Sequence, residues 1–297
     1  MKSRERLRIA IQRSGRLSEP TLTLLERCGL SFRDGSDKLF CFGEDEPVDL
    51  LRVRDDDIPA LIAQGVCDIG IVGRNVLEEF SCANENAACK LQILRPLGFG
   101  RCRLSFALPL ENEYRDAAQL RGARIATAYP NLLRRWLNER RIDAQVITLT
   151  GSVEIAPKLG TADAVCDLVQ TGATLAANHL REVETVLESE AVLAAPEELP
   201  SDGRGDLIDL LLRRLDDVNR VRGTRLLLLH AARGSVEAIA RVLPGTPRLT
   251  VLQMDGAPDQ VMLQALCASE LGWRQLEAIR RAGARELFVL PVECALA

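Results

Sequence analysis

The stretch Asp163–Leu175, DAVCDLVQTGATL, is the part of the sequence around which the chain is organised. Ala164–Val169 is a short apolar run broken by Asp167, which predicts a mostly buried strand. Thr171–Thr174 then predicts a turn, and Leu175–Leu180 the start of a helix. Backbone N–H groups and hydroxyls meet at such a helix N-terminus, which favours an anion. Two functions stay open: a threonine caps the helix, or the turn binds phosphate while Asp167 meets sugar hydroxyls or a divalent cation.

Length and composition are those of a soluble globular protein. The chain has 297 residues, 47% hydrophobic and 27% charged, which predicts two or three domains with an ample core. The net charge of -4 and the lack of a long basic run argue against a nucleic acid partner. The sequence shows no apolar segment of signal-peptide length and none near the ~20 residues of a membrane span. We therefore expect a cytoplasmic protein with no membrane partner.

The cysteine and histidine residues argue against several kinds of active site. The nine cysteines form no CxxC pair, and several lie in apolar runs, which predicts reduced core residues. His179 and His230 are the only histidines and lie far apart in the sequence. A zinc site or a histidine-based nucleophilic triad is therefore not expected. His230 ends the apolar run Leu226–Leu229 and is interpreted as structural.

Two further strand-to-helix junctions resemble the turn at 171–174. A strand at Leu7–Ile11 leads to Ser14–Arg16, and a strand at Asp68–Val72 leads to Gly73–Asn75. Ligands of open α/β sheets bind outside the carboxyl ends of the strands, so these loops are expected to converge on one cleft. The alternative is a plain turn with a solvated arginine.

Acidic residues precede two expected helices. Asp55–Asp57 stand before Ile58-Pro59, and we favour a helix start over a metal cluster because consecutive side chains point in different directions. Ser152 and Glu154 also fit a helix start. Glu154 falls, in addition, at a strand end beside the expected cleft.

The last third of the chain predicts a different arrangement. Val183–Leu187 and Ala191–Ala194 are expected as strands that return to the first sheet, and the Pro/Gly-rich segment 195–206 then breaks the pattern. After a helix at Leu207–Val221 the order is β-α-β-β-α-β, which is ferredoxin-like. The strands are expected at Arg225–Leu229, Leu249–Gln253, Gln260–Cys267 and Leu287–Val292, and the helices at Val236–Leu243 and Glu270–Ala282. This segment lacks an obvious nucleophile or metal cluster, which favours a regulatory or assembly domain.

Six motifs, in order, resemble one family. They are SGRL at 14–17, LRVRDDDIP at 51–59, DIGIVGRNVLEE at 68–79, RIATAYP at 124–130, GSVEIAP at 151–157 and DLVQTGATLAANHL at 167–180. The sequence is similar, from about Leu7 to Val292, to the long, histidine-regulated form of the ATP phosphoribosyltransferases.

This resemblance implies an α/β architecture of two periplasmic-binding-protein-like domains around a cleft, with the chain crossing between them twice. Catalytic domain I would comprise 1–95 with a return segment at 183–200. Catalytic domain II, 96–182, would carry the phosphoribosyl diphosphate loop. The segment 206–297 would be a C-terminal ferredoxin-like (ACT-like) domain that binds histidine.

The implied reaction joins ATP and 5-phosphoribosyl 1-diphosphate into phosphoribosyl-ATP and diphosphate, the first step of histidine biosynthesis, with Mg. No covalent intermediate is required, in agreement with the missing nucleophile. The protein would position two anionic substrates and screen their repulsion with arginines and Mg. Histidine is the implied allosteric inhibitor, and a homo-oligomer, hexamer or dimer, the implied assembly.

The resemblance also implies roles for single residues. Arg16 would contact phosphate groups, Glu154 would lie by the ribose, and Asp167 would meet ribose hydroxyls or Mg. The implied substrate-binding set is Gly15, Asp68, Gly70, Gly73, Asp163, Thr171, Gly172, Ala173, Thr174 and Leu175. His230 and Thr250 are the regulatory candidates. Some relatives carry a basic residue at the position of Asp37, so Lys38 is the alternative for a diphosphate contact there.

Two other functions remain as alternatives. A cytoplasmic small-molecule sensor would use the cleft for binding alone and would need neither Mg nor a second substrate. A non-catalytic subunit of a larger transferase is disfavoured by the presence of Arg16, Asp167 and the TGAT turn.

Overall fold

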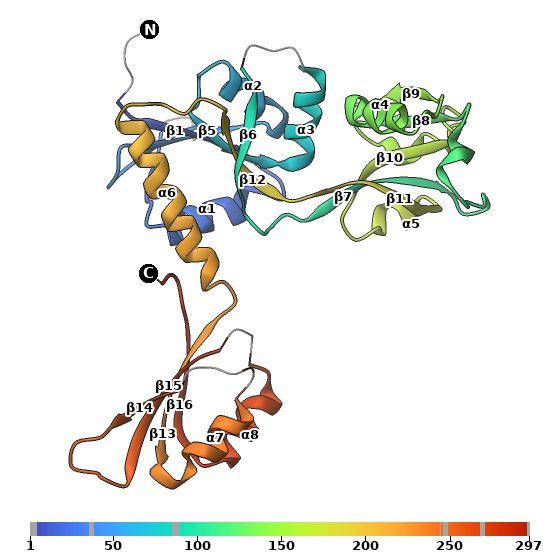
Figure 1. Ribbon diagram of the computed structural model, residues 1–297. Coiled ribbons are helices and arrows are strands. Elements are labelled where there is room, and N and C mark those ends of the chain that lie inside the picture. The colour runs from blue at the N-terminus through green and yellow to red at the C-terminus, as the bar shows by residue number, and fades with distance from the viewer. Residues whose placement is uncertain are drawn as a thin grey trace. The chain divides into compact units, whose positions relative to one another are not determined.

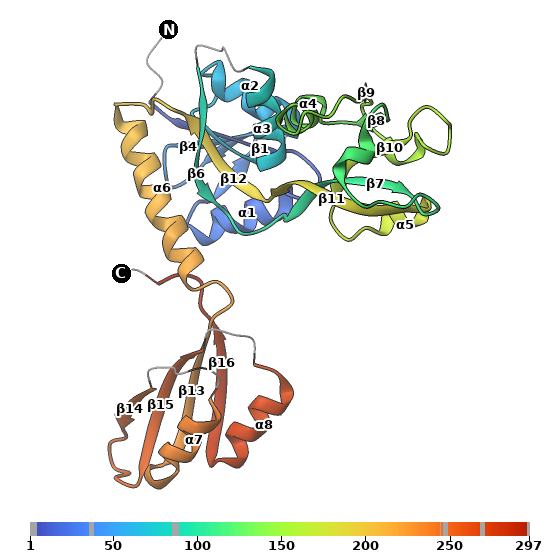
Figure 2. The same ribbon diagram turned by 45° about the vertical axis from the view of Figure 1, so that its right-hand side comes forward.

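The structure is a computed structural model that describes residues 5–35, 39–84, 89–243, 245, 249–267 and 271–295. The segment around Asp37 and Lys38 lies outside the described residues, so the expectation of a diphosphate contact there stays a prediction. The chain forms two compact units, Met1–Asp209 and Leu210–Ala297. Unit 1 contains two sheets, each in its own α/β lobe, and unit 2 contains a third (Figures 1 and 2).

Lobe 1 is built on a seven-stranded sheet of order β2-β3-β4-β1-β5-β12-β6. Its strands are β1 (Leu7–Gln12), β2 (Phe32–Asp34), β3 (Phe40–Gly43), β4 (Val48–Val53), β5 (Ile69–Gly73), β6 (Leu91–Pro96) and β12 (Ala191–Pro196). Its helices are α1 (Ser18–Arg27), α2 (Ile58–Ala63) and α3 (Arg74–Ala83). The central strands β4, β1 and β5 are parallel, so their carboxyl ends share one edge.

Lobe 2 is built on a five-stranded sheet of order β11-β7-β10-β8-β9. Its strands are β7 (Cys102–Pro109), β8 (Arg124–Thr127), β9 (Gln145–Thr148), β10 (Ala164–Val169) and β11 (Leu180–Ser189). Its helices are α4 (Pro130–Glu139) and the short α5 (Ala173–Ala177). Strands β10, β8 and β9 are parallel, so their carboxyl ends also share an edge.

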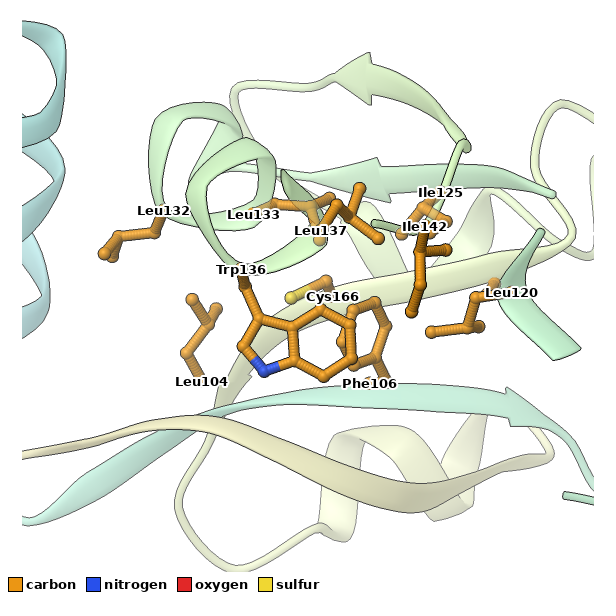
Figure 3. Close-up of a cluster of buried hydrophobic side chains, with 11 residues drawn as sticks. Leu104, Phe106, Leu120, Ile125, Leu132, Leu133, Trp136, Leu137, Ile142 and Cys166 are labelled. Carbon is orange, nitrogen blue, oxygen red and sulfur yellow. The ribbon is translucent and has the colours of Figure 1, made fainter. Parts of the chain in front are cut away.

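The core of lobe 2 forms between α4 and the sheet. Trp136 of α4 packs against Phe106 of β7 with ring centroids 4.8 Å apart (Figure 3). Around this pair lie the buried side chains of Leu104, Leu120, Ile125, Leu132, Leu133, Leu137, Ile142 and Cys166. The apolar positions of α4 recur at helical spacing, so one face of the helix is buried and its position on the sheet is fixed.

The chain crosses between the lobes twice, after β6 and after β11. The expected α/β architecture with two lobes is therefore confirmed. The expectation that Val183–Leu187 returns to the first sheet is wrong, because β11 pairs with β7 in lobe 2 and only β12 pairs with β5 and β6. Alternating apolar residues predict a strand, and they carry no information on which sheet the strand joins.

The helix starts differ from expectation in one respect. Pro59 lies in the first turn of α2, as expected, and a short 3-10 turn at Asp55–Asp57 precedes it. No side chain caps either of these helices, however, and none caps the 3-10 turn Val153–Ile155 after Ser152. The acidic side chains of these segments therefore make no cap hydrogen bond at these helix starts.

Unit 2 has the expected β-α-β-β-α-β order. Its strands are β13 (Arg225–Ala232), β14 (Leu249–Gln253), β15 (Gln260–Cys267) and β16 (Ala284–Pro291), and its helices are α7 (Val236–Val242) and α8 (Trp273–Arg281). The antiparallel sheet has the order β14-β15-β13-β16, and both helices cover the same face of it (Figures 1 and 2). The preceding helix α6 (Gly203–Arg220) contains the boundary between the two units.

Candidate functional site

Three loops of lobe 1 begin at the shared carboxyl edge of β4, β1 and β5. Arg16 follows β1, Asp55 follows β4, and Gly73 ends β5. The Arg16 Nη1 donates a hydrogen bond of 2.6 Å to the Gly100 carbonyl, and the backbone of Gly15 adopts a φ of +117° that lets the loop turn. A Cβ placed on Gly73 would lie 2.6 Å from Asn75 Oδ1, so glycine leaves room for this side-chain amide beside the strand end.

Asp55 has an unusual environment for an aspartate. Its Oδ1 is buried and accepts no hydrogen bond from the part of the chain that the structure describes. Burial, with repulsion from Asp56, raises its pKa from 3.8 to about 6, although Arg16 and the Gly73 N–H oppose the rise. Asp55 thus lies near Arg16 and has one carboxylate oxygen that accepts no hydrogen bond from the described residues. This arrangement indicates a place where a polar ligand would bind.

Lobe 2 contributes the loops that follow β8, β9 and β10. Tyr129 lies two residues after β8, and its hydroxyl accepts a 2.9 Å hydrogen bond from Asn75 Nδ2 of lobe 1. Burial, followed by the charge of Asp167, raises the pKa of Tyr129, and Asp56 and Asp55 raise it further. Carboxylates of both lobes therefore lie close to one phenol, which joins the two strand edges into a single interlobe site.

Asp167 and Glu154 lie together in this interlobe site. Burial raises the pKa of Asp167, and the neighbouring charge of Glu154 raises it further, while the Leu168 N–H lowers it. Glu154 is half-buried in the 3-10 turn after β9. The cost of ionising Asp167 beside a second carboxylate would be offset by an added cation.

The 171–174 turn follows Asp167 and is largely exposed. Gly172 has a φ of +79°, in the left-handed region that favours glycine, and Thr171 Oγ1 accepts a long 3.4 Å hydrogen bond from the Ala173 N–H. Ala173 and Thr174 are exposed at the N-terminus of α5, whereas Leu175 is buried and anchors the helix. Partial capping by Thr171 is thus observed, and the remaining hydroxyl and N–H groups face outward.

Three residues of the expected site lie elsewhere. Asp68 precedes β5, at the opposite end from Gly73, and its carboxylate accepts hydrogen bonds from the Arg8 N–H at 2.8 Å and from Arg204 at 2.7 Å. Asp163 likewise precedes β10, where Arg124 holds it and lowers its pKa. Gly70 is inside the sheet, and a Cβ there would come within 2.6 Å of Ile58 Cγ2.

Sequence reasoning missed two residues of the interlobe site, Asn75 and Tyr129. Asn75 is only 1% exposed, which is rare for a polar side chain at a helix start and depends on its bonds to Tyr129 and Ser189. Both residues stand directly after a strand end within a quoted motif, which is the signal that would have identified them.

The regulatory candidates lie on unit 2. His230 of β13 pairs in register with Met262 of β15, and Thr250 of β14 pairs with Gln264 of the same strand. Both therefore face away from the helices, two strands apart. The His230 Nδ1 lies 3.0 Å from a carboxylate oxygen of Glu286.

The described residues contain neither a metal-type cluster of side chains nor a helix of membrane-spanning character. No three histidine, cysteine, aspartate or glutamate side chains in the described ranges converge as a metal site would require. None of the helices within these ranges combines the length and apolar character needed to cross a membrane.

The fold defines a class of protein: a two-lobed α/β protein in which an arginine, several carboxylates and a Gly/Thr turn lie at or after the carboxyl ends of parallel strands. Comparison with known proteins then identifies the family. A family model described as ATP phosphoribosyltransferase matches residues 54–217, and one described as HisG, C-terminal domain, matches 222–294. The chain belongs to the ATP phosphoribosyltransferase family.

Curated relatives and a solved structure agree with this assignment. The ATP phosphoribosyltransferase of Stenotrophomonas maltophilia (strain R551-3) is 54% identical over 99% of this chain and 97% of its own length. That of Xylella fastidiosa (strain M12) is 51% identical with the same coverage. The structure of an ATP phosphoribosyl transferase (HisG:HisZ) complex from Thermotoga maritima matches 71% of this chain and 98% of that chain, with a TM-score of 0.58 and 27% identity.

The chain is accordingly a pentosyltransferase of histidine biosynthesis. It joins ATP to 5-phosphoribosyl 1-diphosphate and releases diphosphate. The alternative of a sensor that only binds is not favoured by these matches.

Proposed function

We propose that phosphoribosyl transfer takes place at the interlobe site. The proposal rests on the Asn75–Tyr129 hydrogen bond between the lobes and on the charges of Asp55 and Asp167, one from each lobe, that both act on the Tyr129 phenol. Arg16 neighbours Asp55, and Glu154 neighbours Asp167. The reaction brings two polyphosphates together, so it needs positive charge to screen them and carboxylates to orient sugar and metal. Both kinds of group stand at the carboxyl edges of the two sheets, where α/β proteins bind ligands.

Arg16 serves the diphosphate. The hydrogen bond from its Nη1 to the Gly100 carbonyl fixes the direction of the guanidinium. The other N–H groups of this rigid fork suit phosphate oxygens. As the adenine ring nitrogen bonds to the anomeric carbon, the C–O bond breaks and its electron pair leaves with diphosphate. Arg16 stabilises the charge that grows there.

The turn Thr171–Thr174, with Leu175 behind it, holds the 5-phosphate. Exposed hydroxyls and backbone N–H groups at the start of α5 are donors for phosphate oxygens. The left-handed Gly172 lets these donors face one point. The buried side chain of Leu175 keeps the turn on the lobe.

Asp167 and Glu154 fit a magnesium ion shared with the substrate. Oxygen ligands suit magnesium, and the burial of Asp167 beside the charge of Glu154 favours an added cation. Bound magnesium would neutralise phosphate charge. Asp167 itself accepts hydrogen bonds from the ribose hydroxyls, and Glu154 supports the positive charge that develops on the ribose in the transition state.

We assign structural roles to Asp68, Gly70 and Asp163. The two aspartates stand at the amino ends of their strands and have arginine partners, and Gly70 makes room for α2. They are therefore left out of the substrate-binding set, which otherwise keeps Gly15, Gly73 and the turn.

Diphosphate release tests the proposed site. Thr174→Val removes a phosphate donor, and we expect the KM for 5-phosphoribosyl 1-diphosphate to rise at least about tenfold, the value of one charge-assisted hydrogen bond. Thr174→Ser keeps the hydroxyl and should stay within about threefold of the wild type. An unchanged KM in Thr174→Val would remove the turn from the site. Binding of both substrates without diphosphate release would favour the sensor.

We further propose that unit 2 binds histidine and assembles the chain. His230, Glu286 and Thr250 place charged and hydroxyl groups on the sheet face that the helices leave uncovered. On the same face Leu252, Leu266 and Phe288 are 45%, 46% and 54% exposed, which favours contact with another copy.

Two measurements test the role of unit 2. Thr250→Val should raise the histidine concentration needed for half inhibition, and an unchanged value would exclude Thr250 from the effector site. Phe288→Asp should lower the mass of the assembly in sedimentation velocity. An unchanged mass would show that this face is not an interface.

A further inference from the structure

Helix α4 receives its N-terminal cap from the other lobe. The first N–H groups of a helix have no acceptor within the helix, and the residue at its start usually supplies one. The residue before α4 is Tyr129, which makes no such side-chain hydrogen bond. Instead the Glu79 carboxylate of α3 accepts three hydrogen bonds of 2.8 Å from α4. Its Oε1 binds the N–H and the Nδ2 of Asn131, and its Oε2 binds the N–H of Leu132.

Helix α3 is also tied to a chain crossing. The Asn75 N–H donates to Ser189 Oγ at 3.0 Å, and Ser189 Oγ donates to Asn75 Oδ1 at 2.8 Å. Ser189 is the last residue of β11, directly before the chain returns to lobe 1. Helices α3 and α4 pack against each other, as Figure 1 shows. One turn of α3 thus connects the crossing strand with the start of α4.

The cap and the interlobe site depend on the same arrangement of the lobes. Pro130 opens α4 immediately after Tyr129, the phenol that lies near Asp167. A negative charge at a helix N-terminus is stabilised by the helix dipole, and Glu79 gains this stabilisation only while lobe 2 stays in place. The carboxylate therefore acts on the equilibrium between lobe arrangements.

We propose that Glu79 is a positioning residue that latches the two lobes in the arrangement that binds both substrates. The proposal rests on the interlobe site described above and adds to it a residue that does not touch substrate. Removal of an N-terminal cap shifts a folding equilibrium by about 2- to 30-fold. If the cap holds the lobes, its loss lowers the population of the binding arrangement and raises the apparent Kd by up to the same factor.

Glu78 provides a matched control on the same helix. It pairs with Arg74 at 3.3 Å and with Arg135 of α4 at 3.2 Å, and both arginine side chains are more than 40% exposed. Exposed ion pairs of this kind contribute little. Glu78→Gln changes the charge of α3 by the same amount as Glu79→Gln and leaves the cap intact.

The test combines steady-state kinetics with hydrogen–deuterium exchange in the full chain. In Glu79→Ala we expect faster exchange in the peptide that contains the Asn131 and Leu132 amides. We also expect the KM for both substrates to rise about 2- to 30-fold, with kcat changed less than twofold because saturating substrate restores the arrangement. Glu79→Gln keeps one acceptor oxygen and should lie between Glu79→Ala and the wild type. Glu78→Gln should match the wild type.

Faster exchange with unchanged KM values would show that the cap stabilises α4 alone, and this would overturn the proposal. A fall in kcat without a rise in KM would overturn it equally. If the proposed location of the interlobe site were wrong, Thr174→Val would keep full activity. This result differs from those that would overturn the role of Glu79, so the two proposals can be tested separately.

Discussion

Ionisation of Asp55 in the folded protein costs free energy that its neighbouring groups do not offset. Its pKa of about 6 against an ordinary 3.8 corresponds to about 3 kcal/mol of differential stabilisation of the protonated form. Because the folded pKa is raised, the favourable contribution is complete below pH 3.8 and is lost as the pH rises through about 6. At pH 7.5 the folded protein bears the whole cost.

Replacement of Asp55 by asparagine removes this cost and keeps an oxygen for the Gly73 N–H. We expect Asp55→Asn to be more stable than the wild type by up to about 3 kcal/mol at pH 7.5. At pH 4 the same comparison should give less than about 1 kcal/mol, since Asp55 is then largely protonated in the fold. Urea unfolding of both proteins at both pH values measures the difference, and titrations that the two proteins share cancel.

Asp57→Asn is the control for this experiment. Asp57 is exposed two residues further along, so its substitution should change stability by no more than about 0.5 kcal/mol. Equal stability of Asp55→Asn and wild type at pH 7.5, or a gain that persists at pH 4, would refute burial as the origin of the high pKa.

Three further substitutions test the structural assignments by urea unfolding. Phe106→Ala, in the core of lobe 2, should cost about 3–5 kcal/mol, and a loss below about 1 would contradict its burial. Gly70→Ala places a Cβ against Ile58 and should cost about 1–3 kcal/mol, whereas unchanged stability would show that the strand and α2 can separate there. Arg204→Ala removes one ion partner of the buried Asp68 and should cost about 3 kcal/mol, and a neutral effect would show that the remaining partners of Asp68 suffice.

Periodicity and turn chemistry predicted most of the fold. The apolar run Ala164–Val169 is a strand with the expected bounds, and the β-α-β-β-α-β order of unit 2 is present. Helix α5 is shorter than expected and ends at Ala177, and β11 begins three residues later. The sheet that β11 joins could not be predicted, because strand pairing depends on contacts between residues far apart in the sequence.

The sequence-based site assignments agree with the structure for residues near the carboxyl ends of parallel strands, and they disagree for residues at the amino ends. Arg16 and Asp167 lie near the carboxyl ends of parallel strands, and the Asn75–Tyr129 hydrogen bond links the two lobes beside these ends. Asp68 and Asp163 stand one residue before their strands, so the length of a strand separates each from the site. Tyr129 gave no chemical signal of its own, since its environment comes from carboxylates that belong to two distant segments.

The proposed site is tested most directly by the rate of diphosphate release from ATP and 5-phosphoribosyl 1-diphosphate with magnesium, in Asp167→Asn and Asp163→Asn side by side. Both substitutions remove one carboxylate charge from the same strand region, but only Asp167 lies in the interlobe site. We expect kcat/KM to fall at least about 100-fold in Asp167→Asn, which corresponds to about 2.7 kcal/mol of transition-state stabilisation. Asp163→Asn should stay within about twofold of the wild type. Full activity in Asp167→Asn, or an equal loss in both variants, would contradict the location of the site.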